Sequence, residues 1–402
     1  MTERLYYTDA ALLDFEAEVL AVEPVAAGQV RVRLDRTAFY PTSGGQPHDL
    51  GRLGDGPVAD VAEAPDGEIW HTVPAASAPA VGTQVSGLVD AARRFDHRQQ
   101  HSGQHLLSAA FERHCGARTI SFHLGSDTST IDLERPVSGP ETAAAELAAN
   151  EVVWDNRPVR VRFVSSTEAA TLPLRKPTRR QGRIRLVEMS DFDLSACGGT
   201  HVDRTGGVGL IVVTGTERFK QGTRVGFVCG GRALARTRMW RDELGESARL
   251  LSVPVERLAG AIERGRSEQH GLRREVRTLR ERLSAADAEA LLARAVPLDG
   301  WRLVVATVSG HDARSLKALA LELRRQPDLI AVLTTDAEKP LAVVATADDV
   351  TVDAGTLWRA LSEHWGGRGG GRADFAQGAL DSAPDHAISK VVESHLLSYK
   401  DV

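Results

Sequence analysis

The spacing of hydrophobic positions changes along the chain, and each change predicts a different kind of element. Up to residue 92, short runs of alternating apolar and polar residues, such as Gln29–Leu34 and Gln84–Val89, are separated by turns that contain glycine. Alternation with a period of two is typical of strands that have one buried face. A small β-barrel would join such strands without leaving exposed edges, so we expect one in this part of the chain.

From residue 93 to about residue 240 the pattern is mixed. A helical run over residues 93–111 is followed by two strand-like runs, and then by an alanine-rich helix that begins after Gly139 and Pro140. Further strand-like runs follow, up to Cys229. This order of helices and strands predicts an α+β layer.

A third pattern covers residues 251–293, where apolar residues follow one another at steps of four and three between mostly charged residues. This is the seam of a heptad repeat. Gly260, Gly265 and Gly271 weaken a continuous helix here, so a two-helix hairpin and an intermolecular coiled coil both stay open. We expect a homodimer contact in the 251–293 heptads or in the C-terminal domain.

After Pro297 the alternation returns, and it predicts a small α/β domain that contains a glycine-rich run at residues 366–371. The alternative for such a run is a flexible linker. Backbone amides in a glycine-rich loop, flanked by Arg368 and Arg372, are suited to receive phosphate or ribose groups.

Length and composition indicate a globular protein with more than one core. A chain of 402 residues points to two or three domains, and 42% hydrophobic with 26% charged residues is ordinary for such proteins. No apolar stretch is long enough to cross a bilayer and no signal peptide is visible, so we expect a cytoplasmic protein without membrane contact. Three cysteines are too few for a disulfide framework, which leaves Cys197 free to bind a metal ion.

The charge is unevenly distributed. A net charge of -5 argues against indiscriminate binding to a polyanion, yet residues 156–185, the cationic segment, contain nine basic residues and one acid, Glu168. Such a segment is either a solvated charge run or a surface for phosphate groups. Its place directly before a cysteine motif favours a nucleic-acid substrate. The nine residues are Arg157, Arg160, Arg162, Arg175, Lys176, Arg179, Arg180, Arg183 and Arg185.

Two short motifs offer metal ligands. His101 and His105 are four residues apart in the helical run, so their side chains lie on one face of the helix. Cys197 and His201 enclose two glycines, which let the chain turn so that both side chains reach one point. Three imidazoles and one thiolate suit Zn²⁺. The glutamate of the His-Glu-x-x-His metalloprotease motif is replaced by Ser102, which excludes that class.

A glycine-containing loop at residues 38–47 is a further candidate site. Gly44 and Gly45 permit the backbone to approach a ligand closely, although an ordinary tight turn explains the same residues.

Taken together, four motifs in one order resemble the editing half of alanyl-tRNA synthetase. They are residues 39–46, 101–107, 197–202 and 366–378. The match is closest to the free-standing long AlaX-type editing proteins, which keep that half together with a glycine-rich C-terminal domain. No stretch resembles the ATP-using aminoacylation core, so the resemblance implies an ATP-independent hydrolase.

The resemblance implies an α+β fold with four parts: a β-barrel-like domain at residues 1–92, a zinc-binding editing domain at 93–240, a helical coiled-coil connector at 241–296 and a glycine-rich α/β domain at 297–402. It implies hydrolysis of mischarged tRNA(Ala), carrying serine or, in some members, glycine, at a site with one Zn²⁺ per chain. The implied ligands are His101, His105, Cys197 and His201. Where the family usually has threonine after the first histidine, this chain has Ser102, which keeps the hydroxyl.

Other residues are assigned on the same basis. His101, His105 and Gln104 are expected to serve catalysis, and Thr42 or Ser43 is expected to sense the serine hydroxyl. The set expected to bind the substrate is Thr42, Ser43, Gly44, Gly45, Gln46, Arg175, Lys176, Arg368 and Arg372.

Two other functions fit the same motifs. Four protein ligands fill a tetrahedral site, as in structural zinc sites, so a non-catalytic tRNA-binding module is one alternative. A zinc-dependent hydrolase of small esters is the other, although such an enzyme would need neither the cationic segment nor the last third of the chain.

Overall fold

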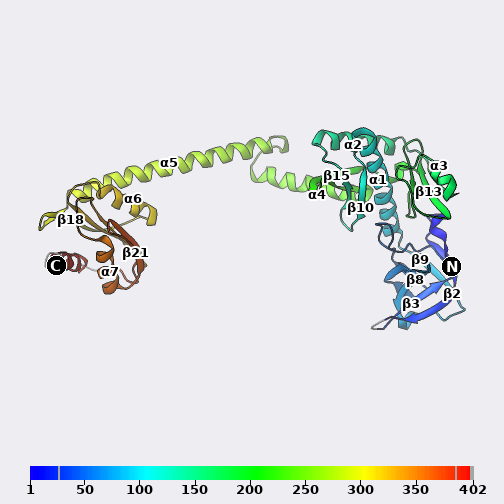
Figure 1. Cartoon of the computed structure of the whole chain (residues 1–402), viewed down its shortest axis with the longest axis horizontal. Coiled ribbons are helices and arrows are strands. Elements are labelled where there is room, and N and C mark those ends of the chain that lie inside the picture. The colour runs from blue at the N-terminus through cyan, green and yellow to red at the C-terminus, as the bar shows by residue number, and fades with distance from the viewer. Residues whose placement is uncertain (26–27, 385–386, 399–402) are drawn as a thin grey trace. The chain divides into compact units, whose positions relative to one another are not determined.

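The computed structural model describes residues 1–25, 28–384 and 387–398, and the chain divides into two compact units, Met1–Ser247 and Ala248–Val402 (Figure 1). Both units mix helices and strands, which confirms the α+β class. The division into four domains at the boundaries given above stays a prediction. Among the described residues, no helix combines the length and the apolar character that a membrane span requires.

The first unit begins with a seven-stranded antiparallel sheet that is nearly closed. Its strands lie in the order β6-β5-β9-β2-β3-β8-β7, and the two end strands follow each other directly in the chain. The predicted alternation is present, since every second residue of β2 is buried from Phe15 to Val19. The strands are β2 (Asp14–Pro24), β3 (Gln29–Leu34), β5 (Gly51–Leu53), β6 (Gly56–Val58), β7 (Asp60–Glu63), β8 (Ile69–Pro74) and β9 (Gln84–Val89). Two short strands, β1 (Glu3–Arg4) and β4 (Arg36–Thr37), pair in parallel beside it.

Helix α1 (Ala91–Cys115) carries the histidine motif through the interior of the unit. The side chain of Asp90 caps its first turn, and Gly116 ends it in the left-handed conformation with φ 61°. Most residues from Arg94 to Phe111 are buried, including many polar ones. Gly103 is required for this packing, because a Cβ there would lie 2.2 Å from the Cys229 sulfur on β16.

Two further sheets hold α1 in place. The four-stranded antiparallel sheet β10-β11-β16-β15 packs against α1 and against α2 (Gly139–Trp154), which starts with a capping box of Ser138 and Glu141. A three-stranded sheet, β12-β13-β14, leads into the Cys197 loop. The elements are β10 (Thr119–Leu124), β11 (Ser129–Leu133), β12 (Val159–Ser165), α3 (Ser166–Thr171), β13 (Arg183–Met189), β14 (Asp193–Ala196), β15 (Ile211–Phe219), β16 (Gly222–Cys229) and α4 (Gly230–Leu250).

The second unit begins with the heptad region, which forms one continuous helix, α5 (Leu258–Leu292). The two-helix hairpin, one of the two alternatives left open by the sequence, does not form within residues 258–292. Gly260, Gly265 and Gly271 all lie inside this single helix. Open space surrounds Gly265 and Gly271, so neither marks a close contact within the chain. Near its end α5 packs through Ala288 and Leu291 against α6 (Ala313–Leu323).

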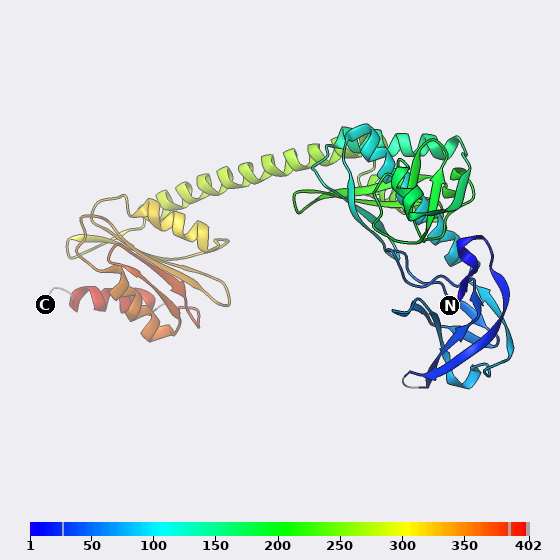
Figure 2. The same cartoon turned by 45° about the vertical axis from the view of Figure 1, so that its right-hand side comes forward.

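A six-stranded sheet with helices on both faces completes the second unit (Figure 2). Its order is β17-β18-β19-β20-β22-β21, and only β18 and β19 run parallel. One core lies between the sheet and α5 and α6, and a second lies between the sheet and α7 and α8. The elements are β17 (Val296–Leu298), β18 (Trp301–Val308), β19 (Leu329–Thr335), β20 (Leu341–Thr346), α7 (Ala354–Trp365), β21 (Arg368–Arg372), β22 (Phe375–Ala379) and α8 (Ile388–Ser398).

Most of the glycine-rich run belongs to an edge strand, β21, so the prediction of a loop is wrong for residues 368–371. Every residue of β21 pairs with β22. The glycines are needed because of close packing: a Cβ at Gly369 would lie 2.4 Å from the Trp358 ring of α7, and one at Gly371 would lie 2.0 Å from the Phe375 carbonyl oxygen.

Candidate metal centre

Four side chains from two distant parts of the sequence meet at one point. His101 and His105 come from α1, Cys197 and His201 come from the loop after β14, and their ligand atoms all lie within 4.8 Å of one another. The Cys197 sulfur is 3.4 Å from Nε2 of His101 and 3.3 Å from Nε2 of His201. Zinc bonds of about 2.0 to 2.3 Å in a tetrahedron place neighbouring ligand atoms about 3.5 Å apart. The two separations from the Cys197 sulfur match this spacing, so the cluster could hold a metal ion such as Zn²⁺.

The loop between Cys197 and His201 is fixed from two sides. Arg185 of β13 is buried and donates to the carbonyl oxygens of Cys197 at 2.7 Å and of Gly199 at 3.0 Å. On the other side Gly199 lies directly against His101, where a Cβ would come within 2.1 Å of the imidazole Cε1. A loop with a larger residue at position 199 would push the first histidine away.

Each histidine of the centre has a polar partner at its ring nitrogen Nδ1. Nδ1 of His101 is 2.8 Å from Oε1 of Gln46, and Nδ1 of His105 is 2.7 Å from Oδ2 of Asp193. Nδ1 of His201 is 3.2 Å from the Ser102 hydroxyl.

The surroundings favour a thiolate at Cys197. Burial opposes ionisation, but the His101 and His201 imidazoles hold the pKa of this thiol well below its ordinary value. Burial lowers the pKa of His201 to about 3. Burial also acts on His105, but its hydrogen bonds with Asp193 and Cys197 prevail and raise its pKa to about 9.

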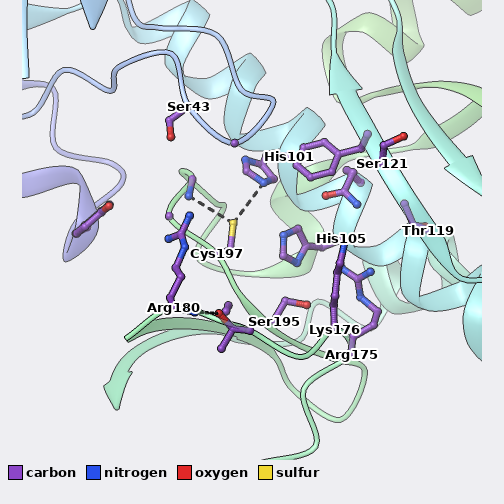
Figure 3. Close-up of a pocket in the computed structure, with 18 of the residues that line it drawn as sticks. Ser43, His101, His105, Thr119, Ser121, Arg175, Lys176, Arg180, Ser195 and Cys197 are labelled. Carbon is purple, nitrogen blue, oxygen red and sulfur yellow. Dashed lines mark hydrogen bonds between the residues drawn. The ribbon is translucent and has the colours of Figure 1, made fainter. Parts of the chain in front are cut away.

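The centre lies at the wall of a cavity of about 740 Å³ within the first unit (Figure 3). Ser43 and Gly44 line one side, and His101, His105 and Gln104 line the helix side. The cationic segment also lines the cavity, through Arg175, Lys176, Thr178, Arg179 and Arg180. The cavity thus joins a metal centre, a small loop and a cationic wall.

Two described families match the sequence. Residues 184–225, which include the Cys197 loop, match the threonyl and alanyl tRNA synthetase second additional domain, and residues 300–394 match the DHHA1 domain. An alanine–tRNA ligase of Archaeoglobus fulgidus is 34% identical over 96% of the chain, and one of Pyrococcus abyssi is 33% identical over 98%. The chain is AlaX-like.

The chain spans 43% of the length of each of these two ligases. An alanine–tRNA ligase of Halorubrum lacusprofundi is 35% identical to the AlaX-like chain, over 96% of the chain and 44% of the ligase. The crystal structure of the C-Ala domain of Aquifex aeolicus alanyl-tRNA synthetase covers 25% of the chain and 95% of that domain, with 22% identity and a TM-score of 0.24.

The residues of the 38–47 loop that were expected to bind the substrate have different surroundings in the AlaX-like chain. Ser43 and Gly44 line the cavity, whereas Thr42 and Gln46 do not. The Thr42 hydroxyl is 3.0 Å from the His48 ring and accepts from the His48 amide. Gln46 is fully buried against His101, and Gly45 packs against the Phe122 ring.

The four basic residues expected to bind the substrate also differ. Arg175 lines the cavity, but its Nε donates to Asp193 at 2.5 Å, so it is part of the support of His105. Lys176 lines the cavity, is exposed and has no acidic partner within the described chain. Arg368 and Arg372 lie in the second unit, on the edge strand β21, where they line a different cavity of about 600 Å³.

Two functional side chains were missed by the sequence reasoning. Asp193 lies four residues before Cys197, in a strand, and Arg185 is one of nine basic residues in the cationic segment. An aspartate shortly before the cysteine motif is a weak signal that a metal-bound histidine has a carboxylate partner. No pattern in the sequence distinguishes Arg185 from its exposed neighbours.

Proposed function

We propose that the chain hydrolyses the ester bond of mischarged tRNA(Ala), chiefly with serine and also with glycine, at a centre that holds one Zn²⁺. The observation that carries this proposal is the shared cavity, in which three of the four metal ligands, the Ser43 loop and a cationic wall adjoin one another. An aminoacyl group would enter between the loop and α1, and phosphates of the tRNA acceptor end would lie along the cationic segment. Zn²⁺ at His101, His105, Cys197 and His201 would supply Lewis-acid chemistry through a fifth coordination position or one that a ligand vacates.

The surroundings of Gln104 support a role for this residue in binding the aminoacyl group. Its side chain is buried and lines the cavity, and its Nε2 donates to the Ser108 hydroxyl at 2.8 Å. Its Oε1 has no hydrogen-bond partner among the described residues. An unpaired buried acceptor costs about 1 to 3 kcal/mol, which a donor on the substrate would relieve. The α-amino group of the aminoacyl ester is such a donor.

Ser43 is the better candidate for sensing the serine side chain. The Thr42 hydroxyl is already engaged by His48, whereas the Ser43 hydroxyl has no hydrogen bond in the described chain, and Ser43 lines the cavity. A hydroxyl that pairs with serine and is left unpaired by alanine distinguishes the two esters by about 1 to 3 kcal/mol, roughly 10- to 100-fold in rate.

Five cations of the cationic segment remain free to bind phosphate. Arg157 pairs with Asp155, Arg175 pairs with Asp193 and Arg185 is buried. Arg162 lies within 4.0 Å of Glu168 and Glu188. Those without an acidic partner among the described residues, and exposed to solvent, are Arg160, Lys176, Arg179, Arg180 and Arg183. Their contacts would make the affinity for tRNA fall with rising salt concentration.

The test compares three esters of one tRNA(Ala), carrying serine, glycine or alanine, with zinc-loaded and chelator-treated protein. We expect release of serine, and of glycine more slowly, with alanine retained and all release lost after chelation. In Ser43→Ala the preference for the serine ester over the alanine ester should fall about 10-fold or more, with unchanged zinc content. Failure of the zinc-loaded protein to release any amino acid would contradict the proposal.

One observation favours a second candidate, a tRNA-binding module without activity. Four protein ligands occupy all positions of a tetrahedral ion, as in structural zinc sites. That candidate predicts binding of tRNA(Ala) with no hydrolysis of any of the three esters, so the same experiment separates the two.

A further inference from the structure

We propose that Gln46, Ser102 and Asp193 are positioning residues of the metal centre, each holding Nδ1 of one ligand histidine so that Nε2 faces the ion. This inference rests on the metal centre of the proposed function, but not on hydrolysis.

The tautomers of His101 and His105 follow from their partners. The amide oxygen of Gln46 and the carboxylate of Asp193 can only accept, so Nδ1 of His101 and of His105 must carry the hydrogen. Their Nε2 atoms then keep the lone pair that a metal ion requires. The Cys197 sulfur lies on the Nε2 side of His101 and His201, which agrees with this orientation.

The orientation of the Gln46 amide is itself determined. The backbone amide of Thr200, which can only donate, lies 3.1 Å from Oε1, and Nε2 of Gln46 donates to the Thr200 hydroxyl at 3.0 Å. One oxygen atom thus receives hydrogens from the ligand helix and from the Cys197 loop. Gln46 is fully buried and does not line the cavity, so this pairing is better explained by support of His101 than by contact with a substrate.

The other two partners are anchored as well. Asp193 is buried and receives hydrogens from Arg175 at 2.5 Å and from the Ser195 hydroxyl at 2.9 Å. The Ser102 hydroxyl accepts from the Val202 amide at 3.1 Å, which ties α1 to the residue after His201. None of the three partners depends on a flexible surface side chain.

Gln46 comes from the segment between β4 and β5, in the part of the chain that forms the N-terminal sheet. The ligands themselves all come from α1 and the Cys197 loop. The metal affinity should therefore depend on a residue of the N-terminal part that contributes no ligand atom.

The test measures the affinity of the full chain for Zn²⁺ by competition with a chromophoric chelator, together with the visible spectrum of the Co²⁺-substituted protein. Gln46→Leu and Ser102→Ala remove the partner atoms, and each should weaken Zn²⁺ binding about 10- to 100-fold and alter the Co²⁺ spectrum. Gln46→Glu and Ser102→Thr keep an acceptor or a hydroxyl and should restore most of the affinity. Gln104→Leu is the matched control, because Gln104 is a similarly buried glutamine whose side chain makes no hydrogen bond to a ligand histidine among the described residues.

Thermal unfolding of the metal-free proteins identifies variants that fail to fold. The inference is overturned if folded Gln46→Leu and Ser102→Ala bind Zn²⁺ as tightly as the original chain. It is also overturned if Gln104→Leu weakens binding to the same extent, or if Gln46→Glu and Ser102→Thr fold but show no recovery. If Gln46→Leu and Ser102→Ala do not fold, the Zn²⁺ affinity of Ser102→Thr is compared with that of the original chain instead. A loss of about 10-fold or more in Ser102→Thr would overturn the inference. Weakened binding in a chain that hydrolyses no ester would support the inference and contradict the proposed function.

Discussion

Gly198 and Gly199 are neighbours in the Cys197 loop but have different surroundings. A Cβ at Gly198 would lie 3.4 Å from the Tyr7 hydroxyl, an ordinary contact distance, whereas one at Gly199 would overlap the His101 ring. Gly199→Ala should therefore displace His101 and weaken Zn²⁺ binding about 10-fold or more, while Gly198→Ala should change it little. Zinc competition on both variants measures this, and equal affinities would contradict the geometry of the loop.

A second prediction at this scale concerns pH. Because the pKa of His105 is raised to about 9, the metal-free protein carries a proton on this ring at pH 7 that the ion must displace. The raised pKa of His105 stabilises the metal-free fold. This contribution is fully present at pH values below the ordinary histidine pKa of about 6.5, and it is lost as the pH rises through about 9. Affinity for Zn²⁺ should rise about 10-fold per pH unit between pH 7 and 9.

Calorimetry in buffers of different ionisation enthalpy measures the protons released on zinc binding. We expect about one proton per chain at pH 7, and fewer in Asp193→Asn, which loses the charge that raises the pKa of His105. Release of no proton by the original chain would contradict the prediction.

The four ligand residues were predicted from spacing alone, because a helical turn and a glycine turn each bring two side chains together locally. Gln46 was assigned to the substrate instead, since its contact with His101 joins residues that are 55 positions apart. Local patterns say nothing about which distant segments meet, so partners of this kind require the three-dimensional structure.

At the scale of elements, α5 has an exposed apolar row. Leu272, Val276, Leu279 and Leu283 are each about half exposed within the described chain and follow heptad spacing. A second copy of α5 packed on this row would bury them, and this is the homodimer contact predicted from the sequence.

The dimer is tested by light scattering after size-exclusion chromatography. Leu272→Glu with Leu279→Glu should make the protein monomeric at concentrations where the original chain is dimeric, because each leucine contributes about 1.5 to 3 kcal/mol when fully buried. Arg274→Glu, an exposed change outside the apolar row, is the control. A monomeric original chain would contradict the prediction.

Elements with regular alternation or helical spacing were predicted well, such as β2, β9 and α1. The strand β21 was not, because glycine is unfavourable in strands and its use there depends on the Trp358 ring behind it. The glycines of α5 led to the opposite error, because they left a two-helix hairpin open where one helix forms. Each glycine lowers the stability of a helix by only about 1 kcal/mol.

At the scale of the whole molecule, the two units carry separate cationic sites. Arg368 and Arg372 of β21 lie beside Arg359 and Trp358 around the second cavity. If this surface holds the tRNA body, Arg368→Ala with Arg372→Ala should raise KM for the serine ester of tRNA(Ala) about 10-fold and leave kcat and zinc content unchanged.

A fall in kcat with constant KM would contradict that assignment. Lys390→Ala, a change in α8 of the same unit that does not line the second cavity, is the control and should leave both constants unchanged.

The order of the four candidate ligands along the chain has a consequence for how the protein would acquire a metal ion. His101 and Cys197 are 96 residues apart, so an ion bound to both closes a long loop, and this closure restricts the unfolded chain. During synthesis, the two histidines of α1 leave the ribosome long before their cysteine partner. The nascent chain can therefore hold zinc tightly only after residue 201 has emerged, and the protein should be vulnerable to proteolysis during this interval.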